Sequence, residues 1–188
     1  ETDIIAEGNA SAKSQDGKQI FANKIIYLKN KGLIQTFGDS KFIDNDKTLT
    51  ANKFSYNINL KIINAIGNVV FVDQEKNKFF FKSFIYNEIE EKGEGSAIIA
   101  KTSDGSYLQS KSGTLDNKKK LVKLDNGEFT SCSNIQNAKG EFCPSWSLKS
   151  KKIFHDKSKK TITHKHAFFK LKKLPILYLL EEVCITSD

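Results

Sequence analysis

Several residue types are missing or scarce in this sequence. It has no arginine and no methionine, and only two prolines, one tryptophan and three cysteines among 188 residues. Three cysteines cannot pair into a closed disulfide framework. The longest apolar run, Leu174 to Leu180, is far shorter than the roughly 18 residues that a membrane-spanning helix needs. These absences argue against a disulfide-stapled miniature protein and against a helical membrane protein.

The amino terminus also lacks two features. The chain begins at Glu1 without an initiator methionine and without a charged-then-apolar leader, as a mature exported form or an excised fragment does. The length fits one ordinary domain, or one domain with an appendage. Fourteen phenylalanines are too many for a disordered tail.

The basic character of the chain comes from lysine alone. Thirty lysines stand against 22 acidic residues, which gives a net charge of +8 and a pI near 9.2. A basic chain raises the hypothesis of a nucleic-acid partner. Proteins that read phosphates and base edges rely on the bidentate arginine fork, which is absent here. We therefore expect a solvated, lysine-rich surface and no nucleic-acid partner.

A repeat runs through the first two thirds of the chain. Each copy opens with a glycine, a small or polar residue and then a strand-like stretch, and successive glycines are 30, 29, 28 and 32 residues apart. The five glycines are Gly8, Gly38, Gly67, Gly95 and Gly127. A period of this length indicates a repeat architecture in which each unit is one supersecondary element.

A second signature falls inside each period. The segments 22–27, 51–56 and 81–86 align, and each ends in a tyrosine. Period-two alternation within these segments, with turn residues between them, predicts paired strands. One hairpin cannot bury its apolar face alone, but stacked copies can. The sequence therefore predicts an all-β protein of about eight to twelve antiparallel strands, as a jelly roll or folded-over sheet bent at the repeat glycines, with helix a minor component.

The last third of the chain does not follow the glycine-led repeat, and it contains a pattern that resembles a known family. Its elements are Phe129 to Cys132, Trp146 with Ser147, Ile153 followed by His155-Asp156, and Leu174 to Tyr178. With the glycine-led repeats, this pattern resembles the amino-terminal periplasmic domain of the LPS-assembly LptD family, also called organic-solvent-tolerance (OstA) proteins. The resemblance covers nearly the whole chain and implies an OstA-like β-jelly roll.

The resemblance also implies a function. The family is the outer-membrane lipopolysaccharide (LPS) translocon, at the periplasmic face of the outer membrane of Gram-negative bacteria. Its amino-terminal jelly roll docks to a periplasmic bridge of similar jelly rolls and passes LPS acyl chains onward through an apolar groove. A β-barrel with its plug lipoprotein then completes the transport. On this basis we expect LPS, the bridge protein, the barrel and the plug lipoprotein as partners.

The chain departs from the family pattern at its end. The family continues into the barrel after the exit tyrosine, whereas here Tyr178 is followed by ten further residues. We expect a fragment or a truncated gene product. The expected organisation is an OstA-like repeat domain over residues 1–126, family-type strands completing the jelly roll over 127–178, and an atypical tail over 179–188.

An LPS carrier needs a continuous apolar lining, because exposing an acyl chain to water costs roughly 0.8 kcal/mol per methylene. Rim lysines could meet the lipid phosphates as point charges. The alternative interpretation is an ordinary filled core. The candidate lining residues are Ile25, Tyr27, Phe42, Phe54, Tyr56, Val69, Phe71, Phe84, Tyr86 and Ile99.

Family members associate edge to edge, which is β-augmentation. We expect the first strand, around Ile4 to Ser14, to be the docking edge.

The cysteines and histidines leave alternatives open. The resemblance implies that Cys132 forms a disulfide bond with a cysteine of the barrel. A local disulfide between Cys132 and Cys143, or free thiols, are the other interpretations. Cys184 has no assigned role. His164 and His166 are one residue apart, so a regular strand places both on one face, yet no third metal ligand is apparent. The pair His155-Asp156 is typical of a turn. We expect no metal and no cofactor.

Trp146 and Pro144 are expected to anchor the chain after a polar loop, and Pro175 to mark the exit from the last strand.

No catalytic motif is present. The sequence has no nucleophile elbow, phosphate loop, zinc finger or paired-carboxylate motif, so we expect no enzyme. Three functions stay open: the LPS-translocon domain as the leading hypothesis, a separate soluble OstA-like LPS carrier that forms the bridge, and a structural β-repeat surface module. The third predicts a filled core without a groove.

Overall fold

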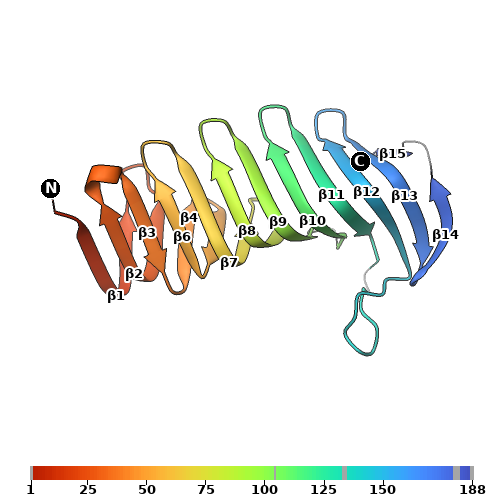
Figure 1. The fold of residues 1–188 in the computed structure, drawn as a ribbon, viewed down its shortest axis with the longest axis horizontal. Helices are drawn as coiled ribbons and strands as arrows, with labels where there is room; N and C mark the ends of the chain where they lie inside the picture. The colour runs from red at the N-terminus through yellow and green to blue at the C-terminus, as the bar shows by residue number, and fades with distance from the viewer. Residues whose placement is uncertain (1, 104, 133–134, 180–182, 187–188) are drawn as a thin grey trace.

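The protein is one long antiparallel sheet that is folded over along its length (Figure 1). The computed structural model describes residues 2–103, 105–132, 135–179 and 183–186. Its strands are β1 (Ile4–Lys13), β2 (Gln19–Leu28), β3 (Leu33–Phe37), β4 (Ser40–Asp44), β5 (Lys47–Ala51), β6 (Lys53–Asn57), β7 (Ile62–Val72), β8 (Lys78–Asn87), β9 (Lys92–Lys101), β10 (Tyr107–Asp116), β11 (Leu121–Thr130), β12 (Trp146–Asp156), β13 (Thr161–Leu171), β14 (Leu174–Leu179) and β15 (Val183–Thr186).

Helix is confined to one short 3₁₀ turn, η1 (Lys29–Lys31), within the described part of the chain. No helix among those residues has the length and apolar character to cross a membrane.

Consecutive strands pair with each other along most of the sheet. From β7 to β14 each strand is hydrogen-bonded to the next one along the chain. At the amino-terminal end, β2 pairs with both β3 and β4, and β7 pairs with both β5 and β6, because two long strands are each broken in the middle. At the other end, β13 pairs with both β14 and β15. The result is the predicted series of stacked hairpins.

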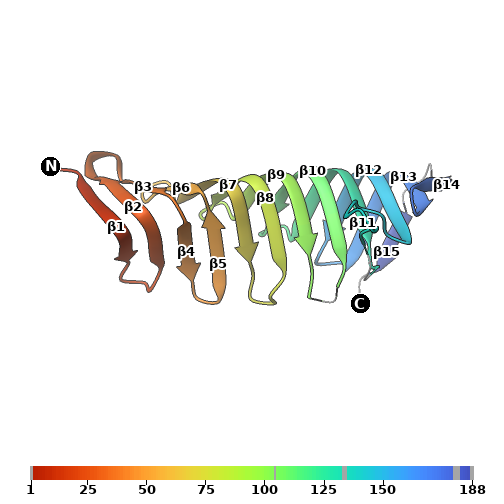
Figure 2. The same ribbon diagram turned by 90° about the horizontal axis from the view of Figure 1, so that it is seen from below.

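The first three units bend where their repeat dipeptide lies. The backbone is left-handed at Gly8, Gly38 and Gly67, with φ of 77°, 70° and 78°, and the register of β7 against β8 shifts between Ile66 and Val69. Consecutive left-handed residues form a bulge that turns the strand sharply. A Cβ at Gly67 would lie 2.7 Å from the amide nitrogen of Asn52, so the close approach also requires glycine. The bends line up and fold the whole sheet into two arms (Figure 2).

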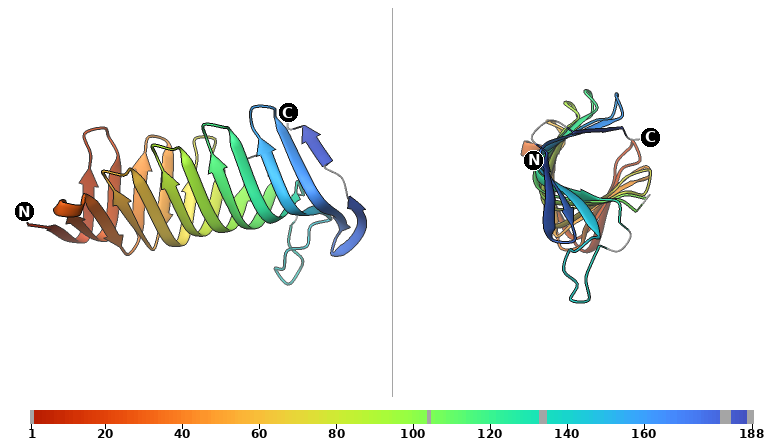
Figure 3. Two further views of the ribbon diagram at one scale, coloured as in Figure 1. Left: turned by 45° about the horizontal axis from the view of Figure 1, so that its top comes forward. Right: turned by 90° about the vertical axis from the view of Figure 1, so that its right-hand side faces the viewer.

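The two arms end in two rows of turns. One row contains the turns at 14–18, 45–46, 73–77 and 102–106, the loop 131–145 and the turn at 172–173; the other contains 29–32, 58–61, 88–91, 117–120 and 157–160. We call these the A lip and the B lip. On the B lip, each turn is tied to the next by a main-chain hydrogen bond of 2.8–2.9 Å, namely Ile58 N–H to Gly32 O, Glu88 N–H to Lys61 O, Asn117 N–H to Glu91 O and Lys157 N–H to Lys120 O. Viewed end-on, the sheet curls so that the two lips lie at its two ends (Figure 3).

The core lies on the concave side of the fold, which we call the inner face. A large cluster of buried side chains occupies its amino-terminal half, from Ala10 to Val69. A smaller cluster of Ile98, Leu124 and Ile153 lies in the carboxy-terminal half. The two arms therefore pack on each other most completely over the first half of the sheet.

The predicted fold class, an all-β folded-over antiparallel sheet of repeated hairpins, is confirmed. The strands outnumber the expected eight to twelve because bends divide long strands in two. The boundary expected at 126/127 falls in the middle of β11, so the sheet runs through it. Part of the expected tail forms β15, and residues 180–182 and 187–188 lie outside the described residues.

Candidate functional site

The candidate site is the inner face, which strand alternation separates from the solvent-facing outer face. On β8, Phe84 packs against the buried cluster, whereas the next residue, Ile85, is 45% exposed on the other side. Because successive side chains of a strand point to opposite faces, each strand contributes every second residue to the inner face until its bend.

Nine of the ten predicted lining residues lie on the inner face. Five are buried in the amino-terminal cluster: Ile25, Phe42, Phe54, Tyr56 and Val69. The other four, Tyr27, Phe71, Phe84 and Tyr86, are half-buried. Their role in lipid binding stays a prediction, but the structure places them on one continuous apolar surface.

The tenth residue, Ile99, does not lie on the predicted face. It lies on the outer face and, with Phe80, Lys101 and Tyr107, lines a pocket of about 260 Å³ under the loop 131–145. The reason is the left-handed residue Ala97, with φ of 49°, which shifts the alternation of β9. Its neighbour Ile98, 29 residues after Val69, is the inner-face residue.

Aromatic rings follow the inner face from one half to the other. In the filled half, the ring of Phe42 lies 6.4 Å from Phe54. Toward the middle, Phe84 stacks on Phe81 at 4.9 Å and lies 6.3 Å from Tyr86. These centroid distances are in the range of favourable aromatic pairs. The aromatic surface therefore continues beyond the filled core, where the rings keep part of their surface exposed.

Sequence reasoning missed the inner-face residues of the last strands. Trp146 of β12 lies between Phe129 of β11 and Phe169 of β13, with ring centroids at 6.2 and 6.1 Å. Leu148 and Ile153 follow on β12. The alternation of apolar residues in these strands could have predicted the inner-face residues, but the family motif, which overlaps the same segments, directed the prediction elsewhere.

Two inner-face glycines lie close to large side chains on the neighbouring strands. A Cβ at Gly95 would lie 2.6 Å from the ring of Phe81, and one at Gly127 would lie 2.5 Å from Ile153. These glycines leave room for the large side chains opposite them.

The lips of the fold are bridged in the filled half. Lys18 of the A lip places Nζ 3.3 Å from Glu88 of the B lip, and Tyr56 donates a hydrogen bond of 3.3 Å to the same carboxylate. Burial works to lower the pKa of Lys18, but the Glu88 carboxylate outweighs it and raises that pKa overall. We call these three side chains the strap.

A second charged group lies under the loop 131–145. Glu128 of β11 is 7% exposed and accepts hydrogen bonds from Ser147 of β12 at 2.6 Å and Lys170 of β13 at 2.8 Å. Burial works to raise its pKa, but the bonds from Lys170 and Ser147 outweigh burial and lower it. This group holds three strands together on the outer face and is structural.

The structure contains Cys132 and Cys143 as free thiols. The sulfur of Cys132 lies 2.9 Å from Ser145 Oγ. Burial works to raise its pKa, but hydrogen bonds from Ser145 and Thr130 outweigh burial and lower it. A disulfide at either cysteine stays a prediction, and the side chain of Cys184 lies outside the described residues.

The two closely spaced histidines do not share a face, contrary to the prediction. His164 is 1% exposed and bonds to Ser150 Oγ at 2.8 Å, and burial lowers its pKa to about 4. His166 has a left-handed backbone, with φ of 50°, which turns its side chain outward to Tyr178 at 3.0 Å. Over the described residues, no three potential metal ligands come together.

His155 and Asp156 end β12, and Asp156 caps the turn that follows by accepting hydrogen bonds from the amides of Ser158 and Lys159.

Both ends of the sheet are edge strands. β1 pairs only with β2, and its Ile4 and Ile5 are 52% and 59% exposed. At the other end, Leu174 and Ile176 of β14 are 68% and 58% exposed. Pro175, expected to mark the strand exit, lies within β14. Exposed apolar edges of this kind are pairing surfaces.

No protein-family model and no curated protein matches the chain. Among solved structures, it is similar to LptH of Pseudomonas aeruginosa, described as the LptA homologous periplasmic component of the conserved lipopolysaccharide transport device. The sequence identity is 9%, the match covers 100% of this chain and 96% of that chain, and the TM-score is 0.29. Similarity at this level establishes neither a shared family nor a shared function.

Proposed function

We propose that the protein is a periplasmic carrier module for lipopolysaccharide, which holds the acyl chains against its inner face. One observation carries this proposal. The inner face is lined with aromatic and aliphatic side chains, and in the carboxy-terminal half several of them, including Phe129 and Trp146, are only half-buried although the small cluster there is buried. A structural module with no cargo would bury them, because exposed apolar surface costs roughly 25 cal/mol per Å².

The two halves of the inner face have different roles in this proposal. The amino-terminal half is filled and strapped shut by Lys18 and Glu88, as the surface-module hypothesis predicts for the whole sheet. The acyl chains bind from Phe71 onward, against Phe84, Tyr86 and Phe129. Non-directional contacts with these side chains would allow a lipid to slide along the sheet.

Two placements of the carrier are compatible with its edges. As a soluble bridge component, it pairs through β1 at one end and through β14 at the other, by strand addition. As the amino-terminal domain of the translocon, it uses β1 for the bridge protein and continues beyond β14 toward the barrel and its plug lipoprotein. The exposed apolar side chains of β14 favour a covering partner in both cases.

Photo-crosslinking tests the carrier role. A benzoylphenylalanine replaces Phe84 on the inner face, and in a matched variant it replaces the adjacent Ile85 on the outer face. Each variant is mixed with purified LPS and irradiated. We expect LPS adducts at Phe84 and at a second inner-face position, Tyr86, with at least fivefold fewer at Ile85, because only the inner face offers continuous apolar contact.

Folding of each variant is checked by circular dichroism before irradiation. Equal capture at Phe84 and Ile85, or an absence of adducts at both Phe84 and Tyr86, would overturn the carrier proposal and favour the surface module.

A further inference from the structure

The B lip changes charge abruptly along its length. Its turn at 88–91 carries three glutamates and no lysine. The next turn, 117–120, carries three lysines, and so does the turn at 157–160. The six lysines, Lys118, Lys119, Lys120, Lys157, Lys159 and Lys160, are all exposed. We call them the lysine lip.

The two lysine-rich turns are direct neighbours. The amide of Lys157 donates a hydrogen bond of 2.9 Å to the carbonyl of Lys120, which fixes the turns side by side. The acidic residues that precede these turns are partly engaged, since Asp116 and Asp156 accept hydrogen bonds from turn amides. Lys159 Nζ also lies 3.8 Å from Asp156. The turn geometry thus concentrates positive charge at one place.

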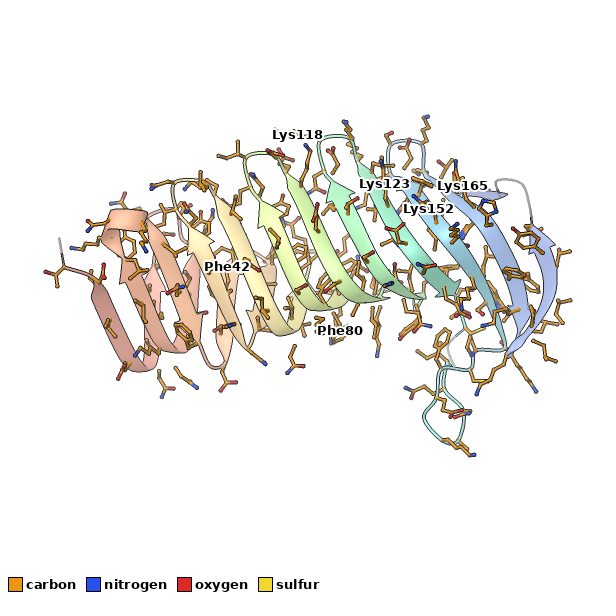
Figure 4. The ribbon with its side chains drawn as sticks, in the orientation of Figure 1. Phe42, Phe80, Lys118, Lys123, Lys152 and Lys165 are labelled. Atoms are coloured by element: carbon orange, nitrogen blue, oxygen red, sulfur yellow. The ribbon has the colours of Figure 1, made fainter. Side chains whose placement is uncertain are left out.

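The adjoining outer surface adds to this charge. Lys152 of β12 lies directly opposite Lys165 of β13, and Lys123 of β11 lies on the next strand. Figure 4 shows Lys123, Lys152 and Lys165 together across β11, β12 and β13, with Lys118 at the tops of the strands. Segments 116–125 and 152–165 together hold nine lysines and three aspartates. Lys152 also lies opposite Asp125, and Lys165 Nζ lies 5.3 Å from the centre of the Phe154 ring, so these two lysines add to the positive surface without being unpartnered.

The lysine lip borders the half of the inner face that is incompletely filled. Val122 and Ile162, which follow its two turns, pack against the smaller inner cluster. A ligand that places apolar chains against that cluster would hold a charged group at the same lip. In the preceding turn, at 88–91, Glu88 pairs with Lys18 and Glu90 with Lys92, so that part of the lip has no excess of positive charge. Lys118 Nζ donates a hydrogen bond of 2.7 Å to the carbonyl of Ile89, which holds this lysine at the border between the two turns. The charge pattern therefore favours an anion at the lysine lip over the turn before it.

We propose that the lysine lip binds the phosphorylated headgroup of the lipid whose acyl chains occupy the carboxy-terminal half of the inner face. This inference rests on the proposed carrier function and adds where the headgroup sits and which chemistry it must have. Lysines suit this role because they act as mobile point charges that hold a phosphate without fixing its geometry. A headgroup held in this way can be released to a next site.

The test compares two lipids and three proteins. Purified protein is titrated with bisphosphorylated lipid A and with a dephosphorylated analogue of the same acyl composition, in detergent below its micelle concentration. The lip variant carries Lys118→Gln, Lys119→Gln, Lys157→Gln and Lys160→Gln. The matched control carries Lys29→Gln, Lys31→Gln, Lys61→Gln and Lys47→Gln, which remove the same charge near the other end of the sheet. Inorganic phosphate and isolated glucosamine phosphate serve as competitors.

We expect the lip variant to bind bisphosphorylated lipid A about tenfold more weakly, from several exposed charge pairs of modest strength each. Its binding of the dephosphorylated analogue should be unchanged, and the control should bind both lipids as the unmodified protein does. Raising the salt concentration should narrow the difference between the two lipids.

The outcomes separate this inference from the carrier function. If the unmodified protein binds both lipids equally, or if the control loses as much affinity as the lip variant, the headgroup site is overturned while the carrier function stands. If neither lipid binds, both the headgroup site and the carrier function are overturned. Displacement of the lipid by inorganic phosphate at equal phosphate concentration would identify a general anion site and overturn the lipid headgroup as its ligand.

Discussion

His164 is a buried titratable side chain whose environment dictates its protonation. It lies on the inner face of β13, and its ring Nδ1 is hydrogen-bonded to Ser150 Oγ. Because the ring is removed from water, burial lowers its pKa from 6.5 to about 4. The folded protein therefore keeps His164 neutral at pH values where the unfolded chain protonates it.

This difference predicts an acid-sensitive stability. His164 contributes fully to the free energy of unfolding above pH 6.5, where neither state holds the proton. As the pH falls toward 4, only the unfolded state gains the proton, and the free energy of unfolding decreases by up to about 3 kcal/mol. His164→Gln removes the titration and should show a flatter profile. Urea unfolding at pH 7 and pH 4.5 measures the difference. Parallel profiles for the unmodified protein and His164→Gln would contradict the argument.

Among the elements, the bends decide the shape of the sheet. Gly67 has φ of 78° and faces Asn52, at the bend between β5 and β6, whose side-chain amide leaves no room for a Cβ. Gly17, in a turn of the A lip, has φ of 88°, but a Cβ added there would meet nothing within 4 Å. Both glycines have a left-handed backbone, but only Gly67 has a neighbouring side chain where a Cβ would lie.

Substitution by alanine separates those two effects. Gly17→Ala should cost about 1 kcal/mol of unfolding free energy, the penalty for a left-handed non-glycine residue. Gly67→Ala should cost about 2–3 kcal/mol, because the new methyl group also displaces Asn52. Chemical denaturation of both variants measures this. Adding Asn52→Ala to Gly67→Ala should recover part of the loss; equal costs at the two glycines would refute the close-approach argument.

The bends also mark how far the sequence could be used to predict the fold. The glycine-led repeat and the alternation within each unit were sufficient for stacked antiparallel hairpins, because turn chemistry and apolar periodicity are local properties. The later bends place Ala97, Asn126 and His166 in the left-handed conformation, whereas the repeat glycines Gly95 and Gly127 do not adopt it. Because the bends at Ala97 and His166 shift the alternation of β9 and β13, Ile99 and His166 lie on the face opposite to the predicted one.

At the scale of the whole molecule, the strap and the lysine lip divide the sheet into a closed half and an open half. The sequence could not reveal the strap, because Lys18 and Glu88 are 70 residues apart and meet only when both lips have formed. The filled core on one side and the half-buried aromatic rings on the other follow from this division. Under the proposed carrier function, this division would direct a lipid to the carboxy-terminal half.

Removal of the strap should destabilise the amino-terminal half of the sheet, including residues far from the substitution in sequence. Glu88→Gln removes the charge that Lys18 and Tyr56 share, and should cost about 1 kcal/mol for a partly exposed pair. It should also speed amide hydrogen exchange in the turn at 14–18, which is remote from Glu88 in sequence but bonded to it across the lips. Glu90→Gln is the matched control, since Glu90 pairs within its own turn region with Lys92. Unchanged exchange at 14–18 in Glu88→Gln would show that the lips are held together without the strap.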